Sequence, residues 1–521
     1  MDQSPSIIDI ITENIKNPLR VEIFPIDQVA AHISTLFVED YGLAVAVADK
    51  IVAKHLVDYF KTLKENLYVL VERKYVDKMY RDAYYHYYSS KLNPYYRDCI
   101  RLSFFDTEMV TDDFKRFDAT GIETLKSRIS EHYLGFLVLR PTFPRIIGRN
   151  ALSPRAIIND NIECCLAKIA ATVYAVKQKV LAFPHASQDH QTMTCAETTV
   201  WSILEYFGNK YPEYKPVLLS TINQTLHKFS YKRLLPSDGL TAEQITYAIR
   251  DFGFGAMIYS REEQEKVSYD FNSIISTYVE SGIPVIAVLE NEELGHAVNI
   301  IGRTKHSPGS VTGTEPHVTL SNGLAVIDFN KIERKYVLID DNQPPYQLAK
   351  LDKPCEDYIT DERWHSCDIT NIIVPLYHRI YLDAVVATKN FYNAFRNSII
   401  GVNDGEKRVA RIFLASTRTY KQYVAMNETL NILVKEMILA LPMPKFIWVA
   451  EVSKLDSYEK GDCDELYIQD ATEPYKNSDV LSNLSFLACY TDGTFFVQNF
   501  GKFERVRTFA HPFQQFKENL N

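Results

Sequence analysis

Reactive side chains of three kinds stand where elements of secondary structure are expected to begin or end. Cys195 opens a predicted helix, His296 opens a predicted strand, and Asp340 and Asp341 follow another predicted strand. A thiolate can attack an amide carbonyl, an imidazole can hold that thiolate as an ion pair and later protonate the leaving amine, and a carboxylate can orient the imidazole. These residue types suit nucleophilic catalysis through a thioester, provided that folding brings them together.

The helix that would present Cys195 is well marked. Thr194 is a good N-cap, Glu197 completes a capping box, and Gly208 is placed to end the helix in the left-handed conformation. Cys195 would then be the first helical residue, where free backbone N–H groups and the helix dipole stabilise a thiolate. The alternative is a small buried hydrophobic residue, which free cysteine often is.

The remaining groups depend on two apolar strands. His296 opens the predicted strand 295–303, and Asp340 and Asp341 follow the predicted strand 336–339. We favour Asp341 as the orienting group, because strand alternation places it on the same face as every second apolar residue before it. Asp340 is the close alternative.

Each of these groups also has a structural interpretation. A lone histidine on an apolar strand is more often a satisfied core residue, and a pair of aspartates before Asn342 and two prolines often only forms a turn. His190 is a rival base, although it lies five residues before the expected helix. The combination of His296 with a capped cysteine helix and a downstream aspartate favours the catalytic interpretation.

The region around these residues carries further short motifs in a fixed order: a Gln before the Cys, an aromatic-Gly helix end, a Gly-Leu-Thr helix start, a Gly-x-Pro-Val strand, a Gly-His strand and a strand closing on Asp. They are Gln188, Cys195, Phe207-Gly208, Gly239-Leu240-Thr241, Gly282-Ile283-Pro284-Val285, Gly295-His296 and Asp340-Asp341. In this order they resemble the C39-like branch of the papain-like cysteine peptidases, over about 155 of the 521 residues.

The resemblance implies a papain-like central domain that hydrolyses peptide or isopeptide bonds without a metal or an organic cofactor. It implies Cys195 as the nucleophile, with an oxyanion hole formed by its backbone N–H and by Gln188. Gln191 competes with Gln188 for this role, and Ala196 stands where the family usually has a glycine. Two other functions stay open: an inactive papain-fold interaction module, and transglutaminase-like acyl transfer in which an amine outcompetes water.

Composition narrows the class of protein. Of 521 residues, 46% are hydrophobic and 24% charged, as in globular proteins, and the net charge of −9 argues against a dedicated nucleic-acid surface. We expect a cytoplasmic protein, because the N-terminal sequence carries no signal-peptide pattern, no apolar run is long enough for a membrane helix, and 8 cysteines in so long a chain form no disulfide framework. The local cluster Cys355/His365/Cys367 lacks a paired C-x-x-C, so we interpret it as structural.

The fold class expected is α+β, in three regions. These are a mixed α/β N-terminal domain (1–182), the papain-like domain (183–374) and an α+β C-terminal region (375–521). The tyrosine-rich stretch 75–96 is interpreted as a packing surface or a face for a protein partner, ahead of single-strand nucleic-acid binding. The predicted helices include 7–15, 41–63, 239–254 with Thr241 as its cap, 271–281 and 427–439. The predicted strands include 20–24, 68–71, 135–139, 380–387, 411–417 and a hairpin in 486–500, and 167–181 is expected to hold one or two strands, with a helix as the alternative.

Overall fold

The computed structural model describes most of the chain. The described residues are 21–110, 114, 119–174, 176–192, 195–228, 240–267, 269–305, 311, 313–320, 323–358, 362–396, 405–474, 485–489, 494–499, 502–507 and 513–521. The chain forms two compact units, and neither is continuous in sequence. Unit 1 comprises Met1–Asp160, Leu166–Gly239 and Asp340–Pro345, and unit 2 comprises Asn161–Cys165, Leu240–Ile339 and Tyr346–Asn521.

These units do not coincide with the three regions expected from the sequence. The contacts that define them follow strand pairing, which joins segments far apart in the chain. Both units contain helices and antiparallel sheets, so the coarse fold class is α+β, as predicted.

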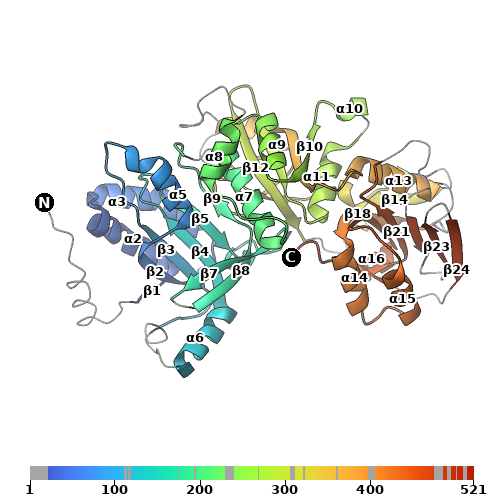
Figure 1. The fold of residues 1–521 in the computed structure, drawn as a ribbon, viewed down its shortest axis with the longest axis horizontal. Coiled ribbons are helices and arrows are strands. Elements are labelled where there is room, and N and C mark those ends of the chain that lie inside the picture. The colour runs from blue at the N-terminus through green and yellow to red at the C-terminus, as the bar shows by residue number, and fades with distance from the viewer. Residues whose placement is uncertain are drawn as a thin grey trace. The chain divides into compact units, whose positions relative to one another are not determined.

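Unit 1 is built on a six-stranded antiparallel sheet, drawn in blue to green in Figure 1. Its central strands β3 and β4 are buried at every residue, which explains why they read as continuous apolar runs. In order across the sheet the strands are β1 (Glu22–Pro25), β2 (Tyr68–Tyr75), β3 (Cys99–Phe105), β4 (Tyr133–Leu139), β5 (Ile147–Leu152) and β9 (His185–Ala186).

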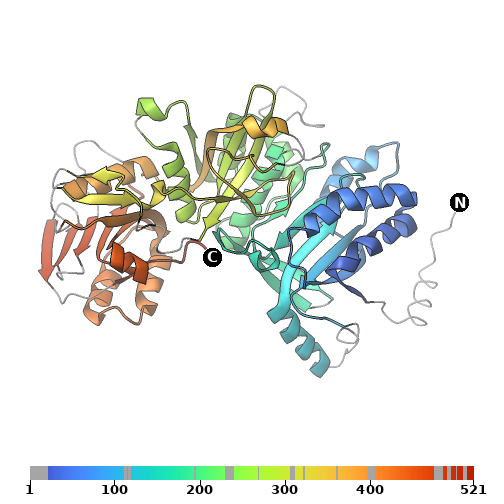
Figure 2. The same ribbon diagram turned by 180° about the vertical axis from the view of Figure 1, so that it is seen from behind.

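A separate hairpin and a set of helices complete unit 1. The hairpin of β7 (Ala167–Val173) and β8 (Val176–Ala182) alternates buried and exposed residues, and α7 packs against β7, β9 and α8. Figure 2 shows α2 and α3 in blue from behind. The helical elements are α2 (Ile26–Tyr41), α3 (Val45–Val52), the π-helical turn η1 (Ala53–Val57), α4 (Asp58–Phe60), α5 (Lys78–His86), η2 (Tyr88–Ser90), α6 (Ala119–His132), η4 (Pro154–Ala156), α7 (Cys195–Lys210) and α8 (Leu219–His227).

Unit 2 contains two sheets, and helix α11 contacts both of them. It packs against β11 and β12 of one sheet and against β18 of the other. The first sheet has seven strands, all antiparallel to their neighbours. Its order is β10 (Phe254–Ser260), β17 (Asp368–Tyr377), β11 (Val285–Glu290), β12 (Gly295–Thr304), β15 (Tyr336–Ile339) and β16 (Gln347–Ala349), and β6 (Ile162–Cys164) also pairs with β12.

The second sheet of unit 2 has eight strands and is antiparallel except where β14 pairs with β18. Helices α14 and α15 cover a core formed with β18, β19 and β21, where side chains such as Val424, Ile438 and Val449 are fully buried. The strand order is β13 (Val318–Thr319), β14 (Ala325–Asp328), β18 (Arg408–Ser416), β19 (Phe446–Lys454), β21 (Glu465–Asp470), β22 (Ser485–Cys489), β23 (Thr494–Asn499) and β24 (Lys502–Arg507).

The remaining elements of unit 2 are short strands and helices. Strands β20 and β25 pair with each other, and α9 begins with a complete capping box in which Thr241 and Gln244 bond reciprocally. The elements are α9 (Ala242–Asp251), α10 (Gln264–Val267), α11 (Phe271–Glu280), η5 (Phe329–Lys331), η6 (Glu362–Ser366), α13 (Ala384–Arg396), α14 (Thr417–Met426), α15 (Ile432–Ala440), α16 (Leu455–Lys460), β20 (Asp462–Cys463) and β25 (Phe513–Gln514).

Several predicted elements differ from those observed. The stretch 380–387 was expected as a strand, but it leads into α13, where the Asp383 carboxylate accepts the Val386 N–H at 2.8 Å and so caps a helix. The expected helix 41–63 is confirmed only over 45–60, and α2 was not predicted. The predicted helix 7–15 lies outside the described residues. Among the residues that the structure describes, no helix is both long and apolar enough to cross a bilayer.

Candidate active site

Cys195 is the first residue of α7, as the sequence predicts. The Cys195 side chain is partly exposed. Cys99, Cys164, Cys165, Cys355, Cys367 and Cys463 are all buried. The predicted N-cap Thr194 lies outside the described residues. Gly208 does not end the helix, which continues to Lys210; a Cβ at Gly208 would lie 2.5 Å from the Pro216 nitrogen, so the glycine permits close approach of the following loop.

Asp341 is held beside the first turn of α7, within unit 1. The Thr198 hydroxyl donates to Asp341 Oδ2 at 2.6 Å, and it also lies 2.9 Å from the Cys195 carbonyl oxygen. The carboxylate is the preferred acceptor, because a bond to an ionised group is shorter and stronger. Asp341 is 6% exposed, so a carboxylate is buried close to the residue predicted as the nucleophile.

Gln188 lies next to the same segment. Its Nε2 donates to Asn342 Oδ1 at 2.5 Å, which fixes the amide and leaves a second N–H on the same nitrogen. Gln191, the alternative, uses its backbone N–H to bind Asp189 Oδ1 and its side chain is half-buried. Of the two glutamines, Gln188 has the more constrained side chain, which an oxyanion donor requires.

The loop that carries Gln188 is organised by Asp189. This carboxylate accepts the backbone N–H groups of Gln191 and Thr192 at 2.9 and 2.8 Å, and the hydroxyls of Thr192 and Tyr88 at 2.6 and 2.7 Å. Burial alone would raise the pKa of Asp189, but the charge of Arg140 and these hydrogen bonds lower it overall. The loop before Cys195 is therefore fixed by a buried carboxylate that stays ionised.

His185 binds the chain just before Asp341. Its Nε2 lies 2.9 Å from the Asp340 carbonyl oxygen, and its Nδ1 lies 2.8 Å from Asn150 Nδ2. A carbonyl only accepts and an amide NH2 only donates, so the ring is neutral with its proton on Nε2. Burial lowers the pKa of His185 to about 4, against the opposing effect of the Asp340 carbonyl.

His296 belongs to unit 2. It lies near the start of β12, pairs with Leu289 of β11 and is 4% exposed. The Trp364 ring stands edge-on to the imidazole at 5.3 Å between centroids, and burial raises the pKa of the neighbouring Cys367 thiol, opposed by the charge of His296. The first residues of β12 therefore hold a buried histidine beside an indole.

Strand β12, which carries His296, pairs with the strand that leads directly into the two aspartates. β12 pairs with β15, where Asn299 stands opposite Ile339, the residue directly before Asp340. Cys195, Gln188, Asp340 and Asp341 belong to unit 1 and His296 to unit 2. The pairing of the Cys195 thiolate with the His296 imidazole stays a prediction.

The rival base His190, the Cys355/His365/Cys367 cluster and the tyrosine-rich stretch 75–96 were also singled out from the sequence. His190 is exposed and adopts a φ of 57°, and His365 Nε2 lies 2.7 Å from the Tyr358 carbonyl oxygen. In the tyrosine-rich stretch, Tyr80 and Tyr88 are buried, whereas Tyr85 is 60% exposed.

Sequence reasoning missed the supporting residues Thr198, His185, Asn342, Asp189 and Trp364. Thr198 offered a local signal, because it lies one turn after Cys195 on the same helix face. Asp189 offered another, because its carboxylate accepts the N–H groups of residues two and three positions later. His185, Asn342 and Trp364 make contacts between segments distant in sequence. A search of family models and of curated proteins found no match to this chain.

Proposed function

We propose that the chain is a cysteine peptidase or related thiol amide hydrolase with a papain-like central domain, in which Cys195 is the nucleophile, His296 the general base and acid, and Asp341 the orienting carboxylate. The hydrogen bond from Thr198 to Asp341 is the observation that supports this function most directly. It holds a buried carboxylate at 2.6 Å from a hydroxyl one turn after a partly exposed cysteine at a helix start.

Chain continuity supplies the second support. Asp341 lies two residues beyond Ile339, whose partner Asn299 follows His296 by three residues on β12. A strand pair of this kind is rigid, and rigid elements hold catalytic groups more precisely than loops do.

In the first half of the reaction, the Cys195 thiolate attacks the carbonyl carbon of an amide, and the carbonyl oxygen becomes an oxyanion. The Cys195 N–H and the second N–H of Gln188 Nε2 would stabilise that charge, and one such donor is worth about 10²–10³ in rate. The imidazolium of His296 then protonates the leaving nitrogen as the C–N bond breaks, which leaves a thioester.

In the second half, His296 removes a proton from water, and the hydroxide attacks the thioester carbonyl. The C–S bond breaks, and the carboxylic acid leaves as the thiolate is restored. Asp341 keeps the imidazole in the tautomer that both steps need. No redox step is involved, and atoms and charge balance with water as the only co-reactant.

Alkylation of the full-length protein tests the thiolate–imidazolium pair. Iodoacetamide would be added at pH 6 and every cysteine followed by peptide mass mapping, in the wild type, His296→Ala and Asp341→Asn. His190→Ala is the matched control, because it removes an exposed histidine five residues before Cys195. We expect Cys195 to react fastest in the wild type and in His190→Ala, and at least tenfold more slowly in His296→Ala.

Three outcomes would decide against the hydrolase. Labelling of Cys195 no faster than that of the other cysteines would favour an inactive interaction module. Equal loss of labelling in His190→Ala and His296→Ala would remove His296 as the specific partner. Incorporation of an added amine in preference to hydrolysis, on a panel of peptide substrates, would favour acyl transfer.

A further inference from the structure

Unit 2 contains a cavity of about 290 Å³, and no residue of the proposed reaction is among those that line it. It is bordered by the end of α11, by β12 and β18, by α16 and by the segment 513–521. This volume is at the lower end of small-molecule sites, so it suits a compact ligand.

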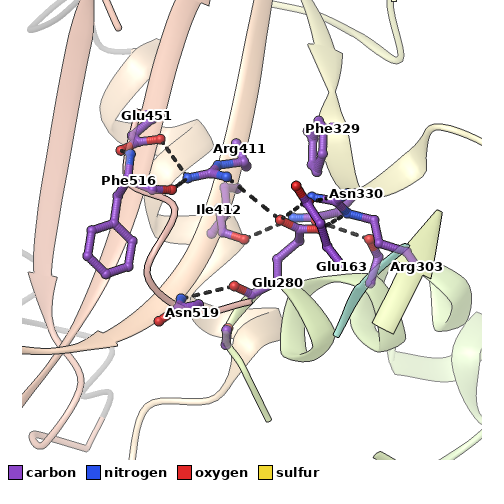
Figure 3. A network of polar contacts seen from close by, with 12 residues as sticks. Glu163, Glu280, Arg303, Phe329, Asn330, Arg411, Ile412, Glu451, Phe516 and Asn519 are labelled. Carbon is purple, nitrogen blue, oxygen red and sulfur yellow. Dashed lines mark hydrogen bonds and ion pairs between the residues drawn. The ribbon is translucent and has the colours of Figure 1, made fainter. Parts of the chain in front are cut away.

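The floor of the cavity is a balanced ion network, shown in Figure 3. Glu280 binds Arg303 through Nε and lies 3.8 Å from Arg411 Nη1. Arg303 also reaches Glu163 Oε2 at 2.7 Å, and Arg411 Nη2 reaches Glu451 Oε2 at 3.0 Å. Arg334 Nη1 lies 3.9 Å from Glu280 Oε1, so three guanidiniums face three carboxylates and the network carries no net formal charge.

The segment 513–521 is tied across this floor. The Phe516 N–H donates to Glu451 Oε1 at 2.8 Å, and Asn519 Nδ2 donates to the carbonyl oxygens of Glu280 and Leu414 at 2.9 and 3.0 Å. The cavity wall next to Lys517 is therefore fixed by hydrogen bonds on both sides of that lysine, which preforms the site.

The rim carries an excess of positive charge. Lys305, Lys460 and Lys517 are exposed and border the cavity, and none has an ion pair in the part of the chain that the structure describes. Lys517 Nζ lies 3.6 Å from the position of a Cβ on Gly461, so it reaches over the cavity edge. Among the described residues that border the cavity, Glu459 is the one exposed carboxylate, which leaves two uncompensated positive charges on the rim of a chain of net charge −9.

The walls add apolar area and a phenol. Phe329 and Phe516 are buried at 2% and 1% exposure, and the half-buried Tyr458 stands 6.2 Å from Phe329 between ring centroids. The Tyr458 hydroxyl makes no hydrogen bond within the described residues, so it can donate to a ligand.

We propose that this cavity binds a small organic phosphomonoester. A phosphomonoester carries about two negative charges at pH 7 and three strong acceptor oxygens, which match two excess positive charges and the free ammonium and phenol donors of the rim. Its organic part would contact the aromatic walls. The assignment is independent of the amide hydrolysis proposed above.

Calorimetric titration of the full-length protein with phenyl phosphate tests this site. Inorganic phosphate has the charge without the ring, and benzenesulfonate has the ring with a single charge. The test variant is Lys305→Gln/Lys517→Gln, and the matched control is Lys168→Gln/Lys179→Gln, which removes the same charge from the exposed face of the β7–β8 hairpin. Urea unfolding of both variants checks that the fold is retained.

We expect one phenyl phosphate per chain, bound about tenfold more weakly by the test variant and with unchanged affinity by the control, with weaker binding of both other probes. Absence of phenyl phosphate binding at millimolar concentration would overturn the proposal. So would equal weakening in both double variants, or equal affinity for benzenesulfonate. Equal affinity for inorganic phosphate would overturn the assignment to an organic ligand.

Discussion

Acidification should loosen the segment that holds Asp341, because it protonates His185. In the folded protein burial lowers the pKa of His185 to about 4, whereas the unfolded chain has the ordinary value of 6.5. Between these values the unfolded chain binds more protons than the folded one. This part of the stability is therefore fully present above pH 6.5 and is lost as the pH falls towards 4.

The magnitude follows from the two pKa values. A gap from 6.5 to about 4, at about 1.4 kcal/mol per unit, gives a loss of about 3 kcal/mol when the shift is fully developed. Geometry explains the cost: a proton on Nδ1 would face the Asn150 Nδ2 donor, and that amide is itself fixed because Tyr59 donates to its oxygen at 3.2 Å.

The assay is backbone hydrogen exchange between pH 4.5 and 7, read at the Asn342 N–H, which donates to Asp340 Oδ1 at 2.8 Å, and in the first turn of α7. The comparison is wild type against His185→Gln, which does not titrate, with His190→Gln as the exposed control. We expect the free energy of opening to fall with pH in the wild type and in His190→Gln, and to stay nearly flat in His185→Gln.

Two results would refute this reasoning. The first is an NMR titration in which the His185 ring of the folded protein has a pKa near 6.5. The second is a pH dependence in His185→Gln as steep as that of the wild type, since the protons would then bind elsewhere.

Two further substitutions have defined outcomes. Gly302→Ala would place a Cβ 2.3 Å from the Glu163 carbonyl oxygen and should lower the free energy of unfolding by about 1–3 kcal/mol in urea titration, whereas Gly295→Ala, with nothing within 4 Å of its Cβ, should change it far less. Thr198→Val removes the donor to Asp341 and should cost about 1–3 kcal/mol, seen as faster exchange in the first turn of α7; unchanged exchange would show that the bond contributes little.

The sequence predicted a helix or strand well where the segment itself contained a capping motif or a regular apolar pattern. The capping box of Thr241 and Gln244 and the strand pair β11–β12 are confirmed. The stretch 167–181, predicted to hold one or two strands, forms most of the hairpin β7–β8. The stretch 380–387 failed because its β-branched residues favour a strand, whereas the capping carboxylate of Asp383 starts a helix.

The site was predictable only in part. The start of α7 at Cys195 and the strand before Asp340 follow from the sequence, because each depends on a short periodic segment. The bonds from His185 and Gln188 to residues 340–342 do not, because they join segments more than 150 residues apart and depend on tertiary packing.

The interleaving of the two units has a consequence for synthesis on the ribosome. Residues 340–345 belong to unit 1, yet they emerge only after residues 240–339 of unit 2. His185, Gln188 and Thr198 can therefore form their hydrogen bonds to residues 340–342 only after residues 240–339 have been translated. Domains generally fold as units while the chain is being made, but here an early fragment ending before residue 340 would carry the cysteine helix without the carboxylate that accompanies it.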